Sequence, residues 1–299
     1  MKVAVAGGTG FIGGHLIRHL LERHDEVVLI SRSRAKRSPF GLKTFQWGEL
    51  PERKAELEGF DAIVNLAGES INQRWTADAK RRILQSRVDT ATRIAELVAS
   101  LRDKPRVVVN GSGISVYGTS ETETYDETSP PRVVDFLSGV VEKWEQAIDA
   151  IPDTRVVKLR TGLVLGRDGG ALPLMALPYK FGVGGRIGSG RQWMSWIHIE
   201  DMVRLIRFVI ENESVRGPVN ATAPHPVTND EFGRALARAL RRPHWFPVPA
   251  ALIKLALGQQ SELLLNGQHV RPRVLLENGF TFLYPTVESA LARLYGKKT

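Results

Sequence analysis

Short apolar runs alternate with segments of helical periodicity over the first 165 residues. Residues 3–6 are wholly apolar and 26–30 nearly so, as expected of strands buried on both faces. Between them, apolar residues recur every three or four positions, which predicts an amphipathic helix. The alternation continues with predicted strands at 43–46, 62–68, 106–110 and 155–159 and predicted helices at 51–57, 76–101 and 134–150. It predicts an α/β fold, a Rossmann-type doubly wound parallel sheet with helices on both faces.

The chain changes character after residue 165. Strand signals become sparse, and five glycines crowd into residues 182–190, which predicts either a mobile lid or a plain, tightly turned connection. Further helices are predicted at 199–211, 229–240, 250–257 and 287–294. We expect a Rossmann domain at 1–165, which a strand near 217–221 rejoins. Residues 166–299 would form mainly a smaller, partly interleaved C-terminal substrate lobe, including a helical segment at 248–291, over the strand ends where ligands of such sheets bind.

Three glycines separate the first predicted strand from the first helix. Gly7, Gly10 and Gly13 follow a Gly-x-x-Gly-x-x-Gly spacing. In a dinucleotide site, one glycine makes the turn, the second admits a pyrophosphate close to the backbone, and the third lets helix and strand pack closely. The phosphates then lie at the helix N-terminus, whose N–H groups favour anions. The expected dinucleotide contacts in this loop are Gly7, Thr9, Gly10, Phe11, Ile12 and Gly13.

The end of the second strand selects the cofactor. An acidic residue about 20 positions after the glycines would bind a ribose 2′-hydroxyl and favour NAD. Here Ser31 and Arg32 stand at this place, and Arg34, Lys36 and Arg37 follow. Arginine suits a 2′-phosphate, so we predict NADP(H) with contacts from Ser31 and Arg32; an ordinary basic surface loop is the alternative.

Composition narrows the function classes. The 299 residues include no cysteine, which excludes disulfides, thiolate metal sites and a cysteine nucleophile. The net charge of +9 is scattered without a nucleic-acid-binding motif, so we do not expect nucleic acid as a partner. No apolar window is long enough for a membrane span, and we expect a cytoplasmic protein. His15 and His19 are four residues apart, but nothing nearby supplies further ligands, and no metal site is predicted.

Several motifs together resemble an extended short-chain dehydrogenase/reductase. They are the glycine loop at 7–13, Asn-Leu-Ala-Gly at 65–68, Val-Tyr-Gly at 116–118, Leu-Arg at 159–160 with Val164 and Gly166, and Trp-Ile-His-Ile-Glu-Asp at 196–201. Gly-Glu at 68–69, Arg-Trp-Thr at 74–76, residues 188–198 and the tail at 261–272 resemble the subgroup called epimerase family proteins. That subgroup has a C-terminal domain of unknown function, similar to residues 248–291 here. The resemblance implies a Rossmann core, NADP(H) and a nucleotide-sugar-like or other small substrate.

The superfamily's usual proton-transferring pair, a tyrosine and a lysine four residues later, is absent. None of the five tyrosines is followed by lysine at that spacing. Residues 135–145, the helix expected to carry the pair, are apolar where it should stand. The serine that usually precedes the Tyr-Gly step by four residues is Gly113 here, which leaves Ser112 one position away. Another acid is therefore needed, because hydride transfer to a carbonyl leaves an alkoxide that takes a proton.

Tyr117 and Ser112 are the candidate catalytic residues. Tyr117 is the first choice as proton donor, with a packed tyrosine as the alternative. Ser112 could hydrogen-bond a substrate oxygen or only cap the backbone at a strand end. Lys80 could act as an acid if buried, although a helix-surface lysine fits the pattern as well.

The remaining candidates would bind ligands. The resemblance implies cofactor contacts at Leu66, Ala67, Gly68, Glu69 and Arg160. Glu69 could instead be a solvated turn residue, and Arg160 could pair with a buried carboxylate. The candidate substrate contacts are Arg74, Trp75, Gln192 and His198. Arg74 with Trp75 could hold an anionic or planar group or form a structural stack, and His198 could orient the lid or cap a helix.

These observations favour an NADP(H)-binding, epimerase-like protein, expected to be an oxidoreductase for a small or nucleotide-sugar-like carbonyl or hydroxyl substrate. The alternative is a catalytically silent NADP(H)-dependent binding or regulatory protein, in which the bound nucleotide sets the arrangement that a partner recognises. The apolar face of the 134–150 helix could form a homodimer, and a core-facing helix would give the same pattern.

Overall fold

Seven parallel strands form the central sheet of the computed structural model, which describes residues 1–32 and 40–296. Their order is β11-β7-β5-β4-β1-β2-β3. The strands are β1 (Lys2–Ala6), β2 (Glu26–Ser31), β3 (Thr44–Gln46), β4 (Ala62–Asn65), β5 (Val107–Gly113), β7 (Arg155–Thr161) and β11 (Gly217–Ala221). The chain begins at β1, moves outward through β2 and β3, and then crosses to β4 on the other side of β1. The predicted Rossmann-type fold is confirmed, and its topological switch point lies between β1 and β4.

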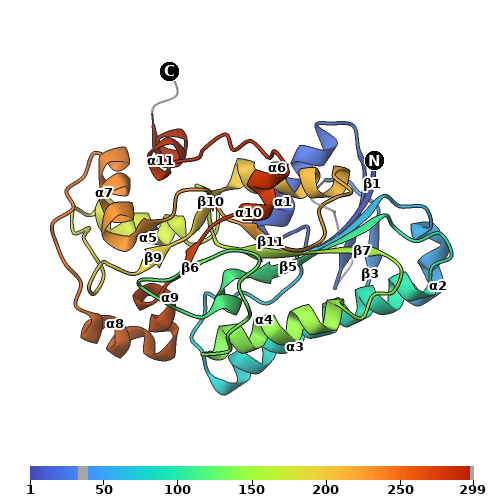
Figure 1. The fold of residues 1–299 in the computed structure, drawn as a ribbon, viewed down its shortest axis with the longest axis horizontal. Coiled ribbons are helices and arrows are strands. Elements are labelled where there is room, and N and C mark those ends of the chain that lie inside the picture. Colours follow the sequence, from blue (N-terminus) through green and yellow to red (C-terminus); the bar gives the residue numbers. More distant parts are fainter. Residues whose placement is uncertain (33–39, 297–299) are drawn as a thin grey trace.

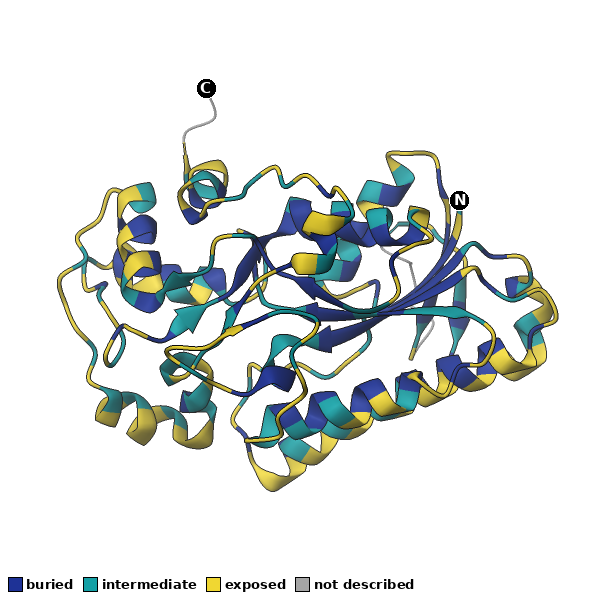
Figure 2. Cartoon of the chain, in the orientation of Figure 1, coloured by how far each residue is buried: buried dark blue, intermediate teal, exposed yellow. Residues whose placement is uncertain are grey.

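Helices cover both faces of this sheet (Figure 1). α1 (Phe11–Leu21) and α6 (Ile199–Glu211) pack together on one face, and α3 (Ala77–Ser100) and α4 (Phe136–Ile148) on the other. The strands between these layers are buried on both sides, while the outer surfaces of α3 and α4 are exposed (Figure 2). In sequence, α6 lies between segments of the smaller lobe, but it packs on a face of the main sheet, so the chain interleaves the two parts.

Local sequence determines where the long helices begin. The Thr76 hydroxyl accepts a hydrogen bond from the Ala79 amide at 3.1 Å and caps α3. At α4, the Asp135 carboxylate accepts from the Ser138 amide, and the Ser138 hydroxyl accepts from the Asp135 amide. Such caps satisfy N–H groups that have no partner within the helix.

The smaller lobe has its own apolar core. Its helices are α5 (Leu172–Lys180), α7 (Asn229–Leu240) and α11 (Val287–Tyr295), and short strand pairs join β8 (Leu163–Leu165) to β10 (Trp196–His198) and β9 (Trp193–Met194) to β12 (Val227–Thr228). The C-terminal part adds α8 (Ala250–Leu257), α9 (Glu262–Leu265), α10 (Arg273–Glu277) and β13 (His269–Val270), which pairs with β6 (Thr124–Tyr125). β13 thereby ties the end of the chain to the segment that follows β5.

Three predicted helices, α6, α7 and α8, have the bounds that the sequence indicates. The helix predicted at 51–57 divides into α2 (Leu50–Arg53) and a 3₁₀ turn at Lys54–Leu57. α5 was not predicted, because Pro173 and Pro178 interrupt its pattern. The two- and three-residue strands outside the main sheet were missed as well, since such short segments carry no alternation that a sequence could reveal.

The glycine-rich loop at 182–190 is a tightly turned connection. The amides of Trp245 and Phe246 both donate to the Gly184 carbonyl, at 3.0 and 3.1 Å. The Gly188 amide donates to the Val248 carbonyl at 2.9 Å, and the Val248 amide donates to the Arg186 carbonyl at 2.8 Å. These bonds hold the loop against the segment before α8 and favour the plain connection over the lid.

No helix in the described part of the chain is both long and apolar enough to cross a membrane.

Candidate nucleotide and substrate site

The glycine turn lies against the loop that follows β4. Gly7 has φ of +77°, and a Cβ there would stand 2.6 Å from the carbonyl carbon of Leu66 and 2.7 Å from the amide nitrogen of Ala67. A Cβ on Gly13 would stand 2.3 Å from the Gly7 carbonyl oxygen. Only glycine fits at either position, as a close approach between backbone segments demands. The structure thus brings the predicted residues Gly7, Leu66 and Ala67 together.

The start of α1 is open to an anion. Gly10 stands at the N-cap position, so no capping side chain bonds to the first N–H groups of the helix. Both Thr9 and Gly10 are exposed. The first N–H groups of a helix have no partner within it, and they carry the positive end of its dipole. Backbone N–H groups near Phe11 and Ile12 are therefore suited to phosphate oxygens.

The Phe11 side chain, at the first position of α1, packs against the segment that follows β8. A Cβ on Gly166 or Gly169 would stand 2.4 Å from its ring, so these two glycines lie flat against it. The next turn of α1 is fastened there as well, because His15 Nε2 lies 3.0 Å from a carboxylate oxygen of Asp168. His15 is thus paired, and no group of three metal-binding side chains occurs among residues 1–32 and 40–296.

Ser31 and Arg32 lie at the carboxyl end of β2, beside β1. Ser31 is half-buried and Arg32 is exposed. This is the edge of the sheet at which the glycine turn lies. Arg34, Lys36 and Arg37 lie outside the described residues.

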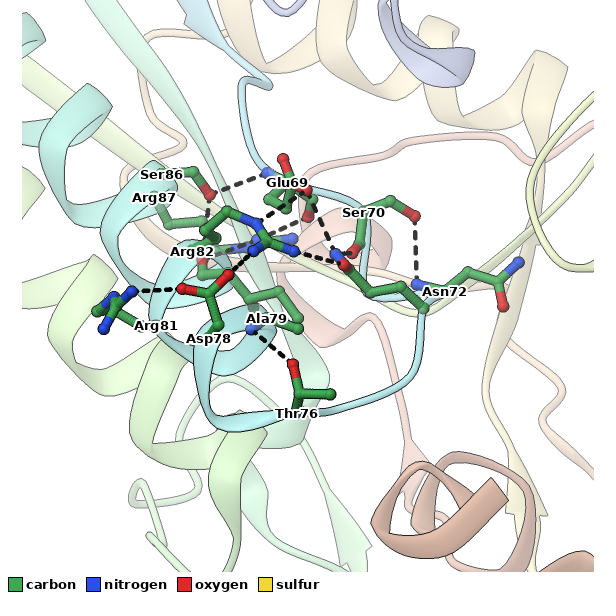
Figure 3. A network of polar contacts seen from close by, with 12 residues as sticks. Glu69, Ser70, Asn72, Thr76, Asp78, Ala79, Arg81, Arg82, Ser86 and Arg87 are labelled. Atoms are coloured by element: carbon green, nitrogen blue, oxygen red, sulfur yellow. Dashed lines mark hydrogen bonds and ion pairs between the residues drawn. The ribbon is translucent and has the colours of Figure 1, made fainter. Parts of the chain in front are cut away.

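Glu69 is anchored to the first half of α3 (Figure 3). Its amide donates to Ser86 Oγ at 2.9 Å, and Arg87 Nη1 donates to its carbonyl at 2.9 Å. Its carboxylate lies 3.4 Å from Gln73 Nε2 and 3.7 Å from Arg82 Nε. These contacts hold Glu69 and the exposed Gly68 beside the glycine turn. They favour an anchored Glu69 over the alternative of a solvated turn residue.

Ser112 and Tyr117 belong to a buried polar network. Arg160 donates from Nε and Nη2 to the two oxygens of Glu145, each at 2.9 Å. Ser112 Oγ donates to Glu145 Oε1 at 2.6 Å. Arg160 Nη1 donates to the Tyr117 hydroxyl at 2.9 Å, which in turn donates to Asn220 Oδ1 at 2.8 Å. The predicted alternative for Arg160, pairing with a buried carboxylate, is confirmed.

Burial and pairing determine which groups of this network are ionised. Burial raises the pKa of Tyr117 to about 12. Burial also opposes ionisation of Glu145, but the hydrogen bonds from Arg160 outweigh it and hold the pKa of Glu145 below its ordinary value. Tyr117 is 0% exposed, so its hydroxyl cannot meet a substrate in this arrangement. The structure favours the packed alternative for Tyr117, and it commits the Ser112 hydroxyl to Glu145.

Trp75 is part of the core and not of a ligand surface. Its Nε1 donates to the Ile71 carbonyl at 3.0 Å, and its ring meets Phe136 edge-on with centroids 5.3 Å apart. Arg74 is exposed, in contrast to the buried Trp75. The structural alternative for Trp75 is favoured, because its polar atom and its ring both have protein partners.

Gln192 and His198 hold the smaller lobe together. Gln192 Nε2 donates to the carbonyls of Ile187 and Leu264, at 3.0 and 2.8 Å. His198 Nδ1 accepts from the Glu200 amide at 3.1 Å and caps α6. Burial lowers the pKa of His198 to about 4, which keeps the ring neutral and able to accept. Capping, the alternative named for His198, is the role that the structure supports.

Two basic side chains of α3, Lys80 and Arg87, contact other segments of the chain. Lys80, considered above as an acid, donates from Nζ to Gln259 Oε1 and lies over the Phe136 ring, 5.0 Å from its centroid. Arg87 was not predicted. Its signal was nonetheless present, since Arg87 stands among Ile83, Ala91 and Ile94, the inward stripe of an amphipathic helix.

Known proteins match this chain along almost its whole length. The model of the NAD dependent epimerase/dehydratase family matches residues 3–221, and that of a domain of unknown function, DUF1731, matches residues 248–294. The chain is 42% identical over 300 residues to the epimerase family protein YfhF of Bacillus subtilis, with 98% of each chain covered.

Two solved structures extend the comparison. The human epimerase family protein SDR39U1 (isoform 2), crystallised with NADPH, is 39% identical and superimposes with a TM-score of 0.91 over 99% of both chains. A nucleoside-diphosphate sugar epimerase from Corynebacterium glutamicum is 31% identical with a TM-score of 0.80, over 99% of this chain and 58% of that one. With its glycine turn, its Rossmann sheet and these relatives, the chain belongs to the NAD dependent epimerase/dehydratase family, in the group of epimerase family proteins that end in a DUF1731 domain.

Proposed function

We propose that this protein binds NADPH across the carboxyl ends of β2, β1 and β4. The observation that carries the proposal is the turn from Gly7 to Gly13, where the backbone of β1, the start of α1 and the Leu66–Ala67 step approach one another too closely for any side chain. Such a cradle suits a pyrophosphate. The human relative, which shares 39% of its sequence with this chain, was crystallised with NADPH.

Each part of the nucleotide has a counterpart along this edge. The N–H groups at the start of α1 would hold the phosphates, and the residues at 66–69 would flank the ribose next to the nicotinamide. The exposed Arg32 guanidinium would pair with the 2′-phosphate, which supports NADPH over NADH. When bound, the nicotinamide would supply a hydride to a carbonyl carbon.

A calorimetric titration tests the cofactor. Wild type should bind NADPH at least about tenfold more tightly than NADH, since a charged pair with the 2′-phosphate is worth roughly 1.4 kcal/mol or more. Arg32→Ala should remove most of this preference. Arg23→Ala, which removes an exposed arginine beyond the end of α1, serves as the matched control and should keep it. Failure of both nucleotides to bind would end the proposal.

We further propose an oxidoreductase that acts on a small or nucleotide-sugar-like carbonyl or hydroxyl substrate. Hydride transfer needs one proton transfer, whereas epimerisation through a keto intermediate needs two, so the missing tyrosine–lysine pair weakens an epimerase reaction more. The proton would have to come from a group other than Tyr117, whose hydroxyl is enclosed by Arg160 and Asn220. Oxidation of NADPH in the presence of a panel of carbonyl compounds is the direct assay.

A second function, NADPH-dependent binding without turnover, rests on the Ser112–Glu145–Arg160–Tyr117 network. It occupies the hydroxyl groups that sequence reasoning assigns to catalysis. The two functions differ in one result. A catalytically silent protein would bind NADPH but would not oxidise it with any carbonyl compound of the panel. The hydrogen-exchange rates of amides in its two lobes would change when NADPH binds.

Partners and location complete the proposal. We propose a small molecule as the partner at the site, with neither nucleic acid nor membrane involved, and a homodimer as an option that light scattering would decide. We propose the cytoplasm as the location, which fractionation of cells that make the tagged chain would test.

A further inference from the structure

Arg87 is a largely buried cation without a carboxylate partner. Its two hydrogen bonds run from one nitrogen, Nη1, to the carbonyls of Glu69 and Ile83, at 2.9 and 3.0 Å. Within residues 1–32 and 40–296, no carboxylate oxygen comes within 4.0 Å of its nitrogens. The Glu69 carboxylate, which lies 3.7 Å from Arg82 Nε, attracts Arg87 only at longer range. Burial lowers the pKa of Arg87 to about 10. A guanidinium taken out of water in this way costs free energy that an anion would offset.

The other nitrogens of Arg87, Nε and Nη2, have no hydrogen-bond partner in the described chain. Neither is among the buried polar atoms without a partner, so both reach accessible space. A guanidinium offers its N–H groups in a planar fork that matches two oxygens of a carboxylate or phosphate. Arg87 therefore has free donors suited to such a group.

The surroundings place these donors at the ligand edge of the sheet. The guanidinium carbon would lie 3.1 Å from a Cβ on Gly68, which is exposed and comes three residues after β4 ends. Arg87 also lies over the Trp144 ring, 5.3 Å from its centroid, and that ring meets Gly111 of β5. The cation is thus held between the ends of β4 and β5. The view in Figure 3 shows Arg87 beside Glu69 at the loop that leaves β4.

This position is separate from the places that the proposed cofactor site uses for phosphates. Phosphates would lie at Gly10 and the start of α1, and the 2′-phosphate at Arg32 beyond β1. Arg87 lies on the far side of β4, where the nicotinamide and the substrate would meet. The facing turn of α4 is apolar there, since Val140 packs on Ile83 one turn before Trp144 meets Arg87.

We infer that Arg87 binds a carboxylate or phosphate group of the substrate, so that the protein acts on an anionic molecule. This inference rests on the proposed NADPH site for its geometry. Glycine at position 68 is part of the arrangement, because a Cβ there would stand 3.1 Å from the guanidinium carbon and crowd the group. The cation-π contact with Trp144 holds the guanidinium plane in place before the anion arrives.

The test uses inorganic phosphate and acetate as probes, with and without saturating NADPH, and reads the melting temperature and the calorimetric affinity. The variants are Arg87→Met, which removes the charge, and Arg87→Lys, which keeps it without the fork. Arg81→Met is the matched control, because Arg81 lies on the same helix but is exposed and paired with Asp78.

We expect the probes to stabilise wild type and Arg81→Met in the presence of NADPH, and to bind Arg87→Met at least about tenfold more weakly. NADPH affinity should change less than about twofold in Arg87→Met if the anion belongs to the substrate. A tenfold loss of NADPH affinity, with phosphate competing against NADPH, would instead assign the anion to the cofactor. Should Arg87→Met fail to fold, Arg87→Lys gives the same comparison with the charge retained.

Equal stabilisation of wild type and Arg87→Met by both probes would overturn the inference and leave Arg87 as an anchor of Glu69. Absence of any stabilisation of wild type would overturn it too. The proposed function fails separately, through absent NADPH binding in wild type, and the phosphate titration without NADPH still reports on Arg87 in that case.

Discussion

Arg160 and Glu145 form a bidentate ion pair inside the protein, with both N···O distances at 2.9 Å. Arg160 is 4% exposed and Glu145 6%. Burial makes both charges costly. Glu145 offsets the charge of Arg160, and Arg160 offsets that of Glu145 together with Lys158, whose Nζ lies 3.6 Å from Glu145 Oε2. The pair joins α4 to β7, and through Ser112 and Tyr117 it also joins β5 and the edge strand β11.

Removing one charge should destabilise the fold strongly. Glu145→Gln leaves Arg160 buried without its counter-charge, and we expect a loss of about 3–5 kcal/mol in the free energy of unfolding, measured by urea denaturation. The double variant Glu145→Leu with Arg160→Met should recover a large part of it, because neither charge remains. A loss below about 1 kcal/mol in the single variant would contradict the buried-pair account.

Tyr117→Phe separates packing from catalysis. The variant loses a hydroxyl that accepts from Arg160 and donates to Asn220, so stability should fall by about 1–3 kcal/mol. In wild type, the raised pKa of Tyr117 means that its contribution to stability is intact below pH 10 and is lost as the pH rises towards about 12. The variant should lack this alkaline loss.

If a carbonyl substrate is found, turnover by Tyr117→Phe measured well below its melting temperature should stay within about threefold of wild type. A proton donor would instead lose a factor of about 10² or more. A drop of that size would restore Tyr117 to catalysis and show that the buried arrangement opens during the reaction.

Neighbouring glycines of α1 should respond in opposite ways to alanine. Gly13→Ala puts a methyl group 2.3 Å from the Gly7 carbonyl oxygen, so the turn must shift and NADPH affinity should fall at least about tenfold. Gly14→Ala meets its nearest neighbour, the Gly8 carbonyl oxygen, at an ordinary 3.8 Å. It should keep NADPH affinity and gain up to about 1 kcal/mol from helix propensity. Calorimetry with NADPH and thermal melts would check both, and equal behaviour of the two variants would refute the cradle.

The lowered pKa of His198 predicts that the protein loses stability in mild acid. Its pKa lies near 6.5 when unfolded and about 4 when folded, because burial opposes the charged ring. The unfolded state therefore binds the extra proton first, and stability falls as the pH drops from about 6.5 towards 4, by up to roughly 3 kcal/mol. His198→Asn keeps a capping oxygen for the Glu200 amide and should flatten this dependence.

Urea denaturation at several pH values between 4 and 7 measures the difference. Burial lowers the pKa of His19 as well, but His19 is present in both proteins and cancels in the comparison. An identical pH profile for wild type and His198→Asn would show that the ring is not the group that titrates.

Local features of this protein could be predicted from the sequence. The bounds of α6, α7 and α8 follow from periodicity and capping residues, which act within a few positions of the chain. The glycine turn could be predicted as well. Only glycine fits at positions 7 and 13, and the spacing of the glycines is visible in the sequence. The family motifs indicated the Rossmann fold and the nucleotide site for the same reason.

Tertiary structure alone decided what the polar side chains do. Tyr117 and Asn220 are 103 residues apart, and Gln192 and Leu264 are 72 apart, so no local pattern could show that these groups satisfy one another. The pairing of β6 with β13 likewise joins residues 124–125 to 269–270 through strands too short to carry a pattern. Arg87 shows the boundary between the two kinds of information. Its place in an apolar helix stripe is visible in the sequence. Only the fold reveals that, among the described residues, no carboxylate pairs with Arg87 and part of its guanidinium stays free beside Gly68.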